Sequence, residues 1–455
     1  MSTLAVIGGG PKAAALAAKA AALRLHSQHT VPDIFIYERD TLGAHWSGGN
    51  GYTDGLQPLC TLAERDLGFP YHLAYGKAVA EDLFAEYSWQ AFAVREGLGP
   101  AGYEQWVLNG RHPPAHSDFA AYLESSIRRS GAEVRYGEVH GLDHDARTGR
   151  WQVTWTGKSG TLGIDRHDAV VITGSGPALP PLPGALTPTK TRNLRVFDGT
   201  SFWTHLVDIE QILSAEPADD RRVVLIGAGG TAAAIAYWFV RNRADVPITI
   251  IGREPTLYAR HPGYFEDRLF SDESAWAALP AHARDEFVRR LTTGVVWDYV
   301  LQGLGDARIA YQCADAIGFR TLPPPSTGLH PEVQVDVRDT VPPGAPASTN
   351  VTAQEGAVFV DARGFDRWWF TSLLPPALAA QLSGPQQAGI LASMDDALRI
   401  SAGGFPAGLH VPMLASRQGP AAGNLMALGW VSDRILRAFV PPPTPGAGGA
   451  IKPAP

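Results

Sequence analysis

Leu4-Ala-Val-Ile7, followed by Gly8-Gly-Gly-Pro11 and the alanine-rich run Lys12–Leu25, is the stretch that decides the fold. Its pattern predicts an apolar strand, a tight glycine turn and a helix built from strong helix formers. Asp33–Glu38 then predicts a second strand that ends in an acid. A strand, a glycine turn, a helix and a strand in this order are typical of a dinucleotide-binding fold.

The glycine turn has the spacing of a pyrophosphate-binding loop. Gly8 permits the tight turn, and Gly10 allows backbone amides to approach the phosphates. Pro11 opens the helix and is counted with the cofactor-binding residues, while Ala13 permits close packing of the helix on the sheet. Glu38 lies where an acid holds a ribose hydroxyl in such folds.

The same pattern returns later in the chain. Arg222–Ile226 predicts a strand, Gly227 and Gly229 lie in the following turn, Thr231–Arg241 predicts a helix, and Ile248–Ile251 predicts another strand. The sequence therefore predicts an α/β protein with two Rossmann-like dinucleotide-binding domains.

The second copy differs from the first where its next strand ends. Thr231 is placed to cap the helix and to touch a phosphate. Arg253, rather than an acid, follows the strand, and a basic residue there suits the 2′-phosphate of NADP and disfavours NAD.

Composition excludes several other classes of protein. The chain has 455 residues, 45% hydrophobic and 18% charged, and a net charge of -7, so neither disorder nor a basic nucleic-acid surface is indicated. No apolar run reaches the length of a membrane span, and no targeting segment is recognised. Cys60 and Cys313 form neither a disulfide framework nor a zinc cluster, and the histidines lack metal-ligand spacing, so we expect no metal site and a cytoplasmic location.

Chain order gives the expected domains. Residues 1–193 and 350–440 are assigned to an FAD domain, and 194–349 to an NADPH domain that includes a helical substrate region at about 265–302. Val358–Asp361 predicts a buried strand that returns the chain to the first domain. The Pro/Gly/Ala-rich tail, 441–455, is predicted to be disordered.

Two dinucleotide folds in series are the layout of flavoproteins, with FAD on the first and a nicotinamide on the second. A dithiol reductase would need a Cys-x-x-Cys pair near the flavin, and Cys60 and Cys313 lie far apart in the sequence. Oxygen or an external acceptor is then the oxidant of the flavin.

The chain resembles the flavin-dependent N-hydroxylating monooxygenases, and most closely the mycobactin/nocobactin-type L-lysine N6-hydroxylases of siderophore biosynthesis. The resemblance runs from Ala5 to Arg434 and leaves out the tail. The segments that carry it, besides the first glycine turn, are Gly55–Tyr71, Tyr87–Gln90, Tyr264–Asp272, Trp369–Leu373 and Gln418–Pro420.

The resemblance implies roles for individual residues. Arg253 matches the arginine that contacts the NADPH phosphate, Gln57 falls near the flavin-contacting glutamine, and Trp46 falls near the tryptophan after the acidic strand. Arg65 replaces the lysine of the family's Lys-Asp-Leu, which contacts the amino-acid carboxylate. An arginine can still bind a carboxylate through two hydrogen bonds.

Two further departures concern the substrate. Asp267 and Thr292 stand where the family has asparagines that hold the amino acid, and Asp267 could instead hold an ammonium group. These departures leave both cofactors intact and leave the amino-acid substrate open between lysine, ornithine and an acylated lysine.

The resemblance also implies a reaction. NADPH reduces FAD, oxygen adds at flavin C4a, and the distal oxygen of the resulting hydroperoxide passes to the side-chain amine of the substrate, here L-lysine. No side chain stands out as a base, so the catalytic residues stay unassigned. Two alternatives remain, a Baeyer–Villiger-type monooxygenase, weakened because Trp203 replaces its histidine, and a largely uncoupled NADPH oxidase or flavin redox sensor. Oligomeric state is left open, with a homo-oligomer among the options.

Overall fold

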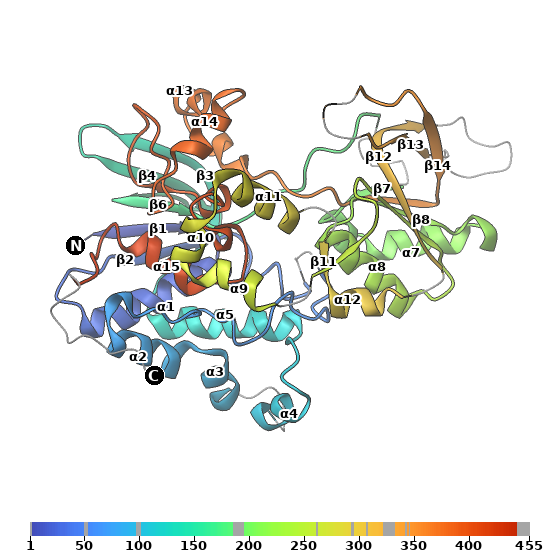
Figure 1. Ribbon diagram of the computed structural model, residues 1–455. Helices are drawn as coiled ribbons and strands as arrows, with labels where there is room; N and C mark the ends of the chain where they lie inside the picture. Colours follow the sequence, from blue (N-terminus) through green and yellow to red (C-terminus); the bar gives the residue numbers. More distant parts are fainter. Residues whose placement is uncertain are drawn as a thin grey trace.

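The protein is described from a computed structural model, which covers residues 2–49, 53–96, 102–184, 195–260, 263–292, 295–305, 308–321, 333–341, 344 and 346–443. Figure 1 shows two α/β units side by side, joined by two long connections. Each unit is built on a seven-stranded sheet. The predicted disordered tail lies outside the described residues, apart from its first three positions.

The first sheet holds the N-terminal strand at its centre. Its order is β16-β6-β1-β2-β3-β4-β5, parallel from β16 to β3 and antiparallel from β3 to β5. The strands are β1 (Thr3–Ile7), β2 (Asp33–Glu38), β3 (Glu133–Asp145), β4 (Arg150–Gly157), β5 (Leu162–His167), β6 (Ala169–Ile172) and β16 (Leu409–His410). Because the chain leaves β1 to reach neighbours on both sides, a crevice opens at its carboxyl end.

The second sheet repeats this plan. Its order is β14-β13-β12-β9-β8-β15-β7, parallel from β7 to β12 and antiparallel from β12 to β14. The strands are β7 (Val196–Asp198), β8 (Val223–Ile226), β9 (Ile248–Gly252), β12 (Ile309–Thr321), β13 (Val333–Asp339), β14 (Val351–Glu355) and β15 (Val358–Asp361). Here β8 lies between β9 and β15, so the equivalent crevice opens at the carboxyl end of β8.

One prediction about chain order is wrong. Val358–Asp361 does form a buried strand, β15, but it pairs with β7 and β8 in the second sheet instead of returning to the first. A run of four apolar residues fits either sheet equally well, so its pattern cannot choose the partner. The last return of the chain to the first unit therefore follows Asp361, later than the predicted position 350.

Helix α1 (Pro11–His26) is the most deeply packed helix of the first unit. Its alanines are buried on several sides at once, and it contacts α2 (Lys77–Tyr87), α5 (His116–Ser130) and α15 (Leu428–Leu436) as well as β2. Small side chains allow this because they let three helices and a sheet approach one axis closely. The position and bounds predicted for this helix are confirmed to within one residue at each end.

Most of the helical region between the two sheets packs on the first core, and its last helix packs on the second core. Helices α9 (Tyr264–Ser271), α10 (Glu273–Ala278), α11 (Ala281–Thr292) and α12 (Asp298–Gly303) occupy the stretch predicted to be helical. Phe270 of α9 is buried in the first core, and Phe287 and Leu291 of α11 pack against it. In Figure 1, α9 and α10 lie beside α15, away from the second sheet.

The remaining elements are short. They are α3 (Trp89–Arg95), α4 (Gly102–Leu108), α6 (Ser201–Thr204), α7 (Leu206–Ala215), α8 (Gly230–Asn242), α13 (Pro376–Gln381), α14 (Gln386–Ser393), the strand pair β10 (Tyr258–Arg260) and β11 (Val295–Trp297), and the 3₁₀ turns η1 (Leu73–Tyr75), η2 (Ala218–Asp220), η3 (Trp369–Leu373), η4 (Pro412–Leu414) and η5 (Pro420–Gly423). Within the described residues, no helix is both long and apolar enough to cross a membrane.

A buried ion pair fastens α1 to α15. Lys19 Nζ lies 2.7 Å from Asp433 Oδ1, and the two side chains are 2% and 1% exposed. Such a pair contributes little when compared with apolar residues of the same size, but removing one partner leaves an uncompensated buried charge.

We therefore expect Lys19→Met to lower the free energy of unfolding by about 3–5 kcal/mol. The double variant Lys19→Met/Asp433→Leu should recover most of this loss, because neither charge then remains. Differential scanning calorimetry of the three proteins at equal flavin loading measures the difference. A double variant as unstable as the single one would show that packing, rather than charge, dominates here.

Candidate functional site

The first glycine turn lies at the carboxyl end of β1 and requires glycine. Gly8 has φ +101°, and a Cβ there would lie 2.7 Å from Thr173 Oγ1, which follows β6. Its amide donates to Tyr37 O at 2.9 Å. Two neighbouring strands therefore hold the turn in place.

Glu38 holds the turn from the end of β2. One carboxylate oxygen accepts the Gly9 amide at 2.7 Å, and the other accepts the Asp40 amide at 2.8 Å. Burial raises the pKa of this carboxyl, although both hydrogen bonds oppose the rise. Each oxygen keeps a lone pair, so the predicted bond to a ribose hydroxyl is compatible with this arrangement and stays a prediction.

The start of α1 offers room for an anion. Gly10 is the N-cap, Pro11 is the first helical residue, and no side chain caps the helix. A Cβ on Gly10 would meet no atom within 4 Å, so the helix start is open on this side. Uncapped amides and the positive end of the helix dipole favour a phosphate group at such a position.

Two residues of the following loop fit a flavin. Gln57 is 2% exposed, and its Nε2 has no hydrogen-bond partner among the described residues. A buried amide donor without a partner costs free energy, so it points to a ligand acceptor. Trp46 is half-buried and packs edge-on against His116 and Phe119, at ring distances of 4.7 and 5.4 Å. Its contact with a cofactor stays a prediction.

Lys12, which the sequence reasoning did not single out, lies in the first turn of α1. Its side chain is buried, and its ammonium lies 3.3 Å from Met413 Sδ in η4. Burial lowers the pKa of Lys12 to about 8. A lysine next to a glycine turn in an otherwise alanine-rich buried helix was the signal that could have identified it.

The second glycine turn lies at the carboxyl end of β8 and has the same form. Gly227 has φ +111°, and a Cβ there would lie 2.5 Å from Ala362 O, so only glycine fits. Gly229 is the N-cap of α8, and a Cβ on it would meet nothing within 4 Å. Both turns therefore present an open helix start to the same kind of ligand.

The predicted capping role of Thr231 is wrong. The helix begins one residue earlier, at Gly230, and its N-cap has no side chain. Thr231 lies inside the first turn, where its Cγ2 would be 2.6 Å from a Cβ on Gly199. Its methyl group thus packs against the segment after β7, and a contact with a phosphate stays a prediction.

Arg253 lies next to this turn. It is exposed and follows Gly252, whose added Cβ would lie 2.6 Å from Ala228 Cβ in the turn. No ion pair engages the guanidinium among the described residues. This placement is compatible with a 2′-phosphate.

Two of the three predicted substrate residues meet. Arg65 Nη2 lies 2.7 Å from Asp267 Oδ2, and the side chains are 8% and 24% exposed. Arg65 also lies over the Phe69 ring and donates to Met426 O at 3.4 Å. Burial lowers the pKa of Arg65, and the Asp267 charge works against that shift.

The third predicted residue is not placed with them. Thr292 is the last residue of α11, and its side chain is outside the described part of the structure. Arg260 is an unforeseen neighbour: it pairs with Glu266 at 3.2 Å and lies between the rings of Phe270 and Trp297. Arg260 is therefore engaged by protein groups.

Asp66 anchors the loop that carries Arg65. It is 1% exposed and accepts the Trp89 amide, the Gly68 amide and the Tyr71 hydroxyl. Burial raises its pKa to about 6, although these hydrogen bonds favour the charged form. Asp66 thus positions the loop, a structural role that its place next to Arg65 in the sequence did not indicate.

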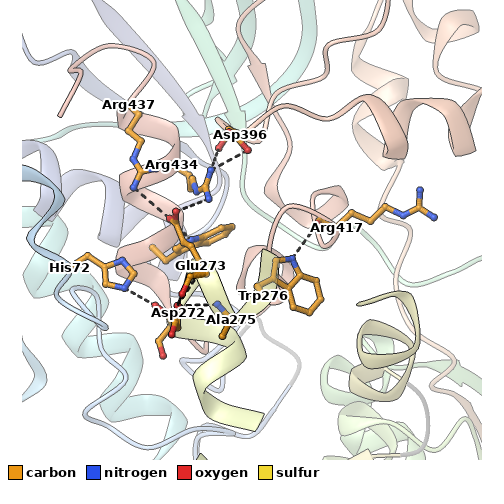
Figure 2. A network of polar contacts seen from close by, with 12 residues as sticks. His72, Asp272, Glu273, Ala275, Trp276, Asp396, Arg417, Arg434 and Arg437 are labelled. Atoms are coloured by element: carbon orange, nitrogen blue, oxygen red, sulfur yellow. Dashed lines mark hydrogen bonds and ion pairs between the residues drawn. The ribbon is translucent and has the colours of Figure 1, made fainter. Parts of the chain in front are cut away.

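A second polar network, shown in Figure 2, attaches the helical region to the first unit. Glu273 of α10 receives the Trp430 indole N–H at 3.0 Å and pairs with Arg434 at 3.0 Å. Arg434 also pairs with Asp396 at 3.2 Å, and Trp276 donates to Arg417 O at 3.1 Å. These bonds fix α10, which directly follows α9, against α15.

No cluster of side chains suited to a metal ion occurs among the described residues. The groups that are present suit anionic nucleotides and a zwitterion instead: two open helix starts, one exposed arginine, and one arginine–aspartate pair.

Comparison with known proteins shows which family this chain resembles. Residues 84–303 match the family described as L-lysine 6-monooxygenase/L-ornithine 5-monooxygenase. The L-lysine N6-monooxygenase MbtG of Mycobacterium sp. strain MCS is 34% identical over 449 residues, covering 96% of this chain and 95% of that protein. MbtG of Mycobacterium tuberculosis strain H37Rv is 34% identical over 458 residues, covering 97% and 96%.

Solved structures of lysine and ornithine hydroxylases are also similar to this chain. The lysine monooxygenase NbtG from Nocardia farcinica matches with a TM-score of 0.74 and 29% identity, covering 95% of this chain and 98% of that one. The Kutzneria sp. 744 ornithine N-hydroxylase KtzI, solved with reduced FAD, NADP⁺ and L-ornithine, shares the fold, with a TM-score of 0.70, 19% identity, and coverage of 96% and 99%.

The open space at Gly10 makes a sharp test of the first turn. Gly10 has φ -94° and ψ -163°, which any residue adopts, and a Cβ there clashes with no protein atom. Gly10→Val should therefore fold normally but bind FAD at least a hundredfold more weakly, because the side chain would fill the space for the diphosphate. Titration of the apoprotein, followed by flavin fluorescence, measures this loss. Gly389→Val, at a position of α14 where an added Cβ also meets no atom within 4 Å, is the control. A yellow, FAD-loaded Gly10→Val protein would contradict the assignment.

Proposed function

This chain belongs to the family of L-lysine 6-monooxygenases and L-ornithine 5-monooxygenases, and we propose that it is an FAD- and NADPH-dependent L-lysine N6-monooxygenase. The observation that supports lysine as the substrate is the 34% identity, over 96% of the chain, to a relative named L-lysine N6-monooxygenase. Hydroxylysine made in this way would serve a hydroxamate siderophore.

The residues of the chain fit the two cofactors at separate crevices. The Gly8–Pro11 turn and the unpaired amide of Gln57 would hold FAD, and the Gly227–Gly229 turn with Arg253 would hold NADPH. Once bound, the two cofactors supply the reduction of molecular oxygen and its transfer to the amine. The protein binds and orients the reactants and keeps water from them.

The Arg65–Asp267 pair suits the amino-acid end of the substrate. A free amino acid carries one carboxylate and one α-ammonium, and the pair presents one charge of each sign at 2.7 Å. Arg65 would take the carboxylate through two hydrogen bonds, and Asp267 would take the α-ammonium. Such a site holds the zwitterion at its backbone end and leaves the ε-amine directed away.

The proposal includes a cytoplasmic location, in keeping with two free cysteines, Cys60 and Cys313. Ornithine and acyl-lysine remain competing substrates. The competing class of protein is an uncoupled NADPH oxidase or flavin sensor. It is retained as an alternative because Arg65 and Asp267 differ from the residues that the family has at these positions.

The decisive experiment incubates the FAD-loaded protein with NADPH and L-lysine, L-ornithine or N6-acetyl-L-lysine, and assays hydroxylamine product and peroxide separately. We expect lysine-dependent hydroxylamine that accounts for most of the NADPH consumed. Peroxide with no hydroxylamine for any amine would reject the monooxygenase, and a preference for ornithine would reject lysine as the substrate.

Arg253 should select the nicotinamide cofactor. Loss of a charge-assisted bond to the 2′-phosphate removes roughly 1.5–3 kcal/mol, which is about ten- to a hundredfold in affinity. Arg253→Ala should raise the KM for NADPH in flavin reduction by that factor and leave NADH nearly unchanged. Arg320→Ala, an exposed arginine of β12, is the control. An equal loss with both nucleotides would make Arg253 a structural residue.

Asp267 should select for the α-ammonium. Asp267→Asn keeps the shape and removes the charge, so it should lower kcat/KM for lysine about tenfold or more while changing 6-aminohexanoate, which lacks the α-ammonium, much less. Glu286→Gln, an exposed acid of α11, is the matched control. If the ratio of kcat/KM for lysine to kcat/KM for 6-aminohexanoate stays the same, Asp267 does not bind the α-ammonium.

A further inference from the structure

Lys12 is a buried cation without an anionic partner. Its side chain is 6% exposed, and among the described residues its ammonium has one polar neighbour, the thioether sulfur of Met413 at 3.3 Å. A thioether accepts hydrogen bonds only weakly. Lys19, two turns further along the same helix, shows the contrast, because it is equally buried and pairs with Asp433 at 2.7 Å.

Burial of an unpaired ammonium destabilises a protein unless something compensates for it. Replacing Lys12 with an apolar residue of similar length would remove that cost, yet the chain has a lysine here. Polar groups that are retained at such a cost are typical of ligand sites. The question is then which anion the ammonium meets.

The position of Lys12 in the fold indicates which anion its ammonium meets. Lys12 lies in the first turn of α1, two residues after Gly10, where the helix start is open and uncapped. Met413 lies in η4, directly after β16, and β16 and β6 run parallel beside β1 in the same sheet. The ammonium therefore lies at the carboxyl edge of three neighbouring strands, which is where open α/β sheets bind nucleotides.

We propose that Lys12 is the buried counter-ion for the diphosphate of FAD, acting together with the open start of α1. The inference rests on the proposed function, because it requires that FAD binds in the first crevice. A diphosphate carries two negative charges, more than the partial charge of a helix start offsets. Lys12 supplies a full positive charge from inside the protein, where a low dielectric constant strengthens the attraction.

The proposal predicts a link between FAD binding and protonation. Burial lowers the pKa of Lys12 to about 8 in the free protein, and a bound diphosphate would raise it. Below pH 8 the lysine is charged with or without FAD, so affinity should not change with pH. Above pH 8, binding takes up a proton, so affinity should fall as pH rises, by at most tenfold per pH unit.

Other titratable groups lie on the elements packed around α1, and their contributions must be subtracted. They are Glu38 of β2, Tyr75 of η1, Asp82 of α2, Asp118 of α5, His410 of β16, and Asp433 and Arg434 of α15. A variant without the Lys12 ammonium retains all of them. The difference between its pH profile and that of the unaltered protein therefore isolates Lys12.

The experiment compares the apoproteins of the unaltered chain, Lys12→Met and the control Lys77→Met, an exposed lysine of α2. FAD affinity is measured by flavin fluorescence from pH 6.5 to 9.5, and ADP is titrated as a competitor that carries the diphosphate without the flavin. We expect Lys12→Met to bind both FAD and ADP about ten- to a hundredfold more weakly below pH 8 and to lose the decline above pH 8. The apoprotein of Lys12→Met should melt no lower than the unaltered one, because an unpaired buried charge has been removed.

The outcomes distinguish a failure of the proposed function from a failure of the role proposed for Lys12. An unaltered chain that does not bind FAD would overturn the proposed function itself. An unaltered chain that binds FAD, with a Lys12→Met variant of equal affinity and equal pH profile, would overturn only the role of Lys12. Weaker binding of FAD with unchanged binding of ADP would overturn the assignment to the diphosphate, and a destabilised apoprotein with a parallel pH profile would make Lys12 a packing residue.

Discussion

The burial of α1 constrains the rest of the structure. One end of this helix has to meet the turn after β1, and its sides have to accept a sheet and three helices, so seven of its eleven buried positions are alanine. The two exceptions that carry charge are Lys12 and Lys19. Lys19 is satisfied by Asp433 and fixes α15. The same close packing leaves Lys12 no protein carboxylate among the described residues, and its ammonium contacts the Met413 sulfur.

The second unit repeats the plan of the first and is attached to it in a limited way. Both sheets combine parallel strands with an antiparallel extension that begins at a 13-residue strand, β3 or β12. Two of the connections between the units pair with each other, since Leu179 N donates to Gly364 O at 3.0 Å and Asp366 N donates to Pro177 O at 2.9 Å. The helical region, by contrast, is fixed to the first core through Phe270 and the Glu273 network. Arg260 of β10 pairs with Glu266 of α9, so a movement of the nicotinamide sheet would also act on α9.

The Arg65–Asp267 pair gives the departures from the family pattern a common explanation. Considered separately, an arginine for a lysine and an aspartate for an asparagine each put the substrate in doubt. In the structure they face each other at 2.7 Å, so the added negative charge compensates the positive one. The loop carrying Arg65 is held by Asp66, and the helix carrying Asp267 is held by Phe270 in the first core, which gives the pair a fixed geometry.

The sequence by itself determined the two glycine turns, their strands and helices, and the order of the two units, because short-range sterics and hydrophobic period are local properties. It also placed Arg253 correctly at a strand end. Only the tertiary structure decided that β15 joins the second sheet, that α9 packs on the first core, and that Lys12 is buried without a carboxylate. Strand partners, ion pairs and desolvation depend on residues far apart in the chain, and a pattern within one segment contains no information about them.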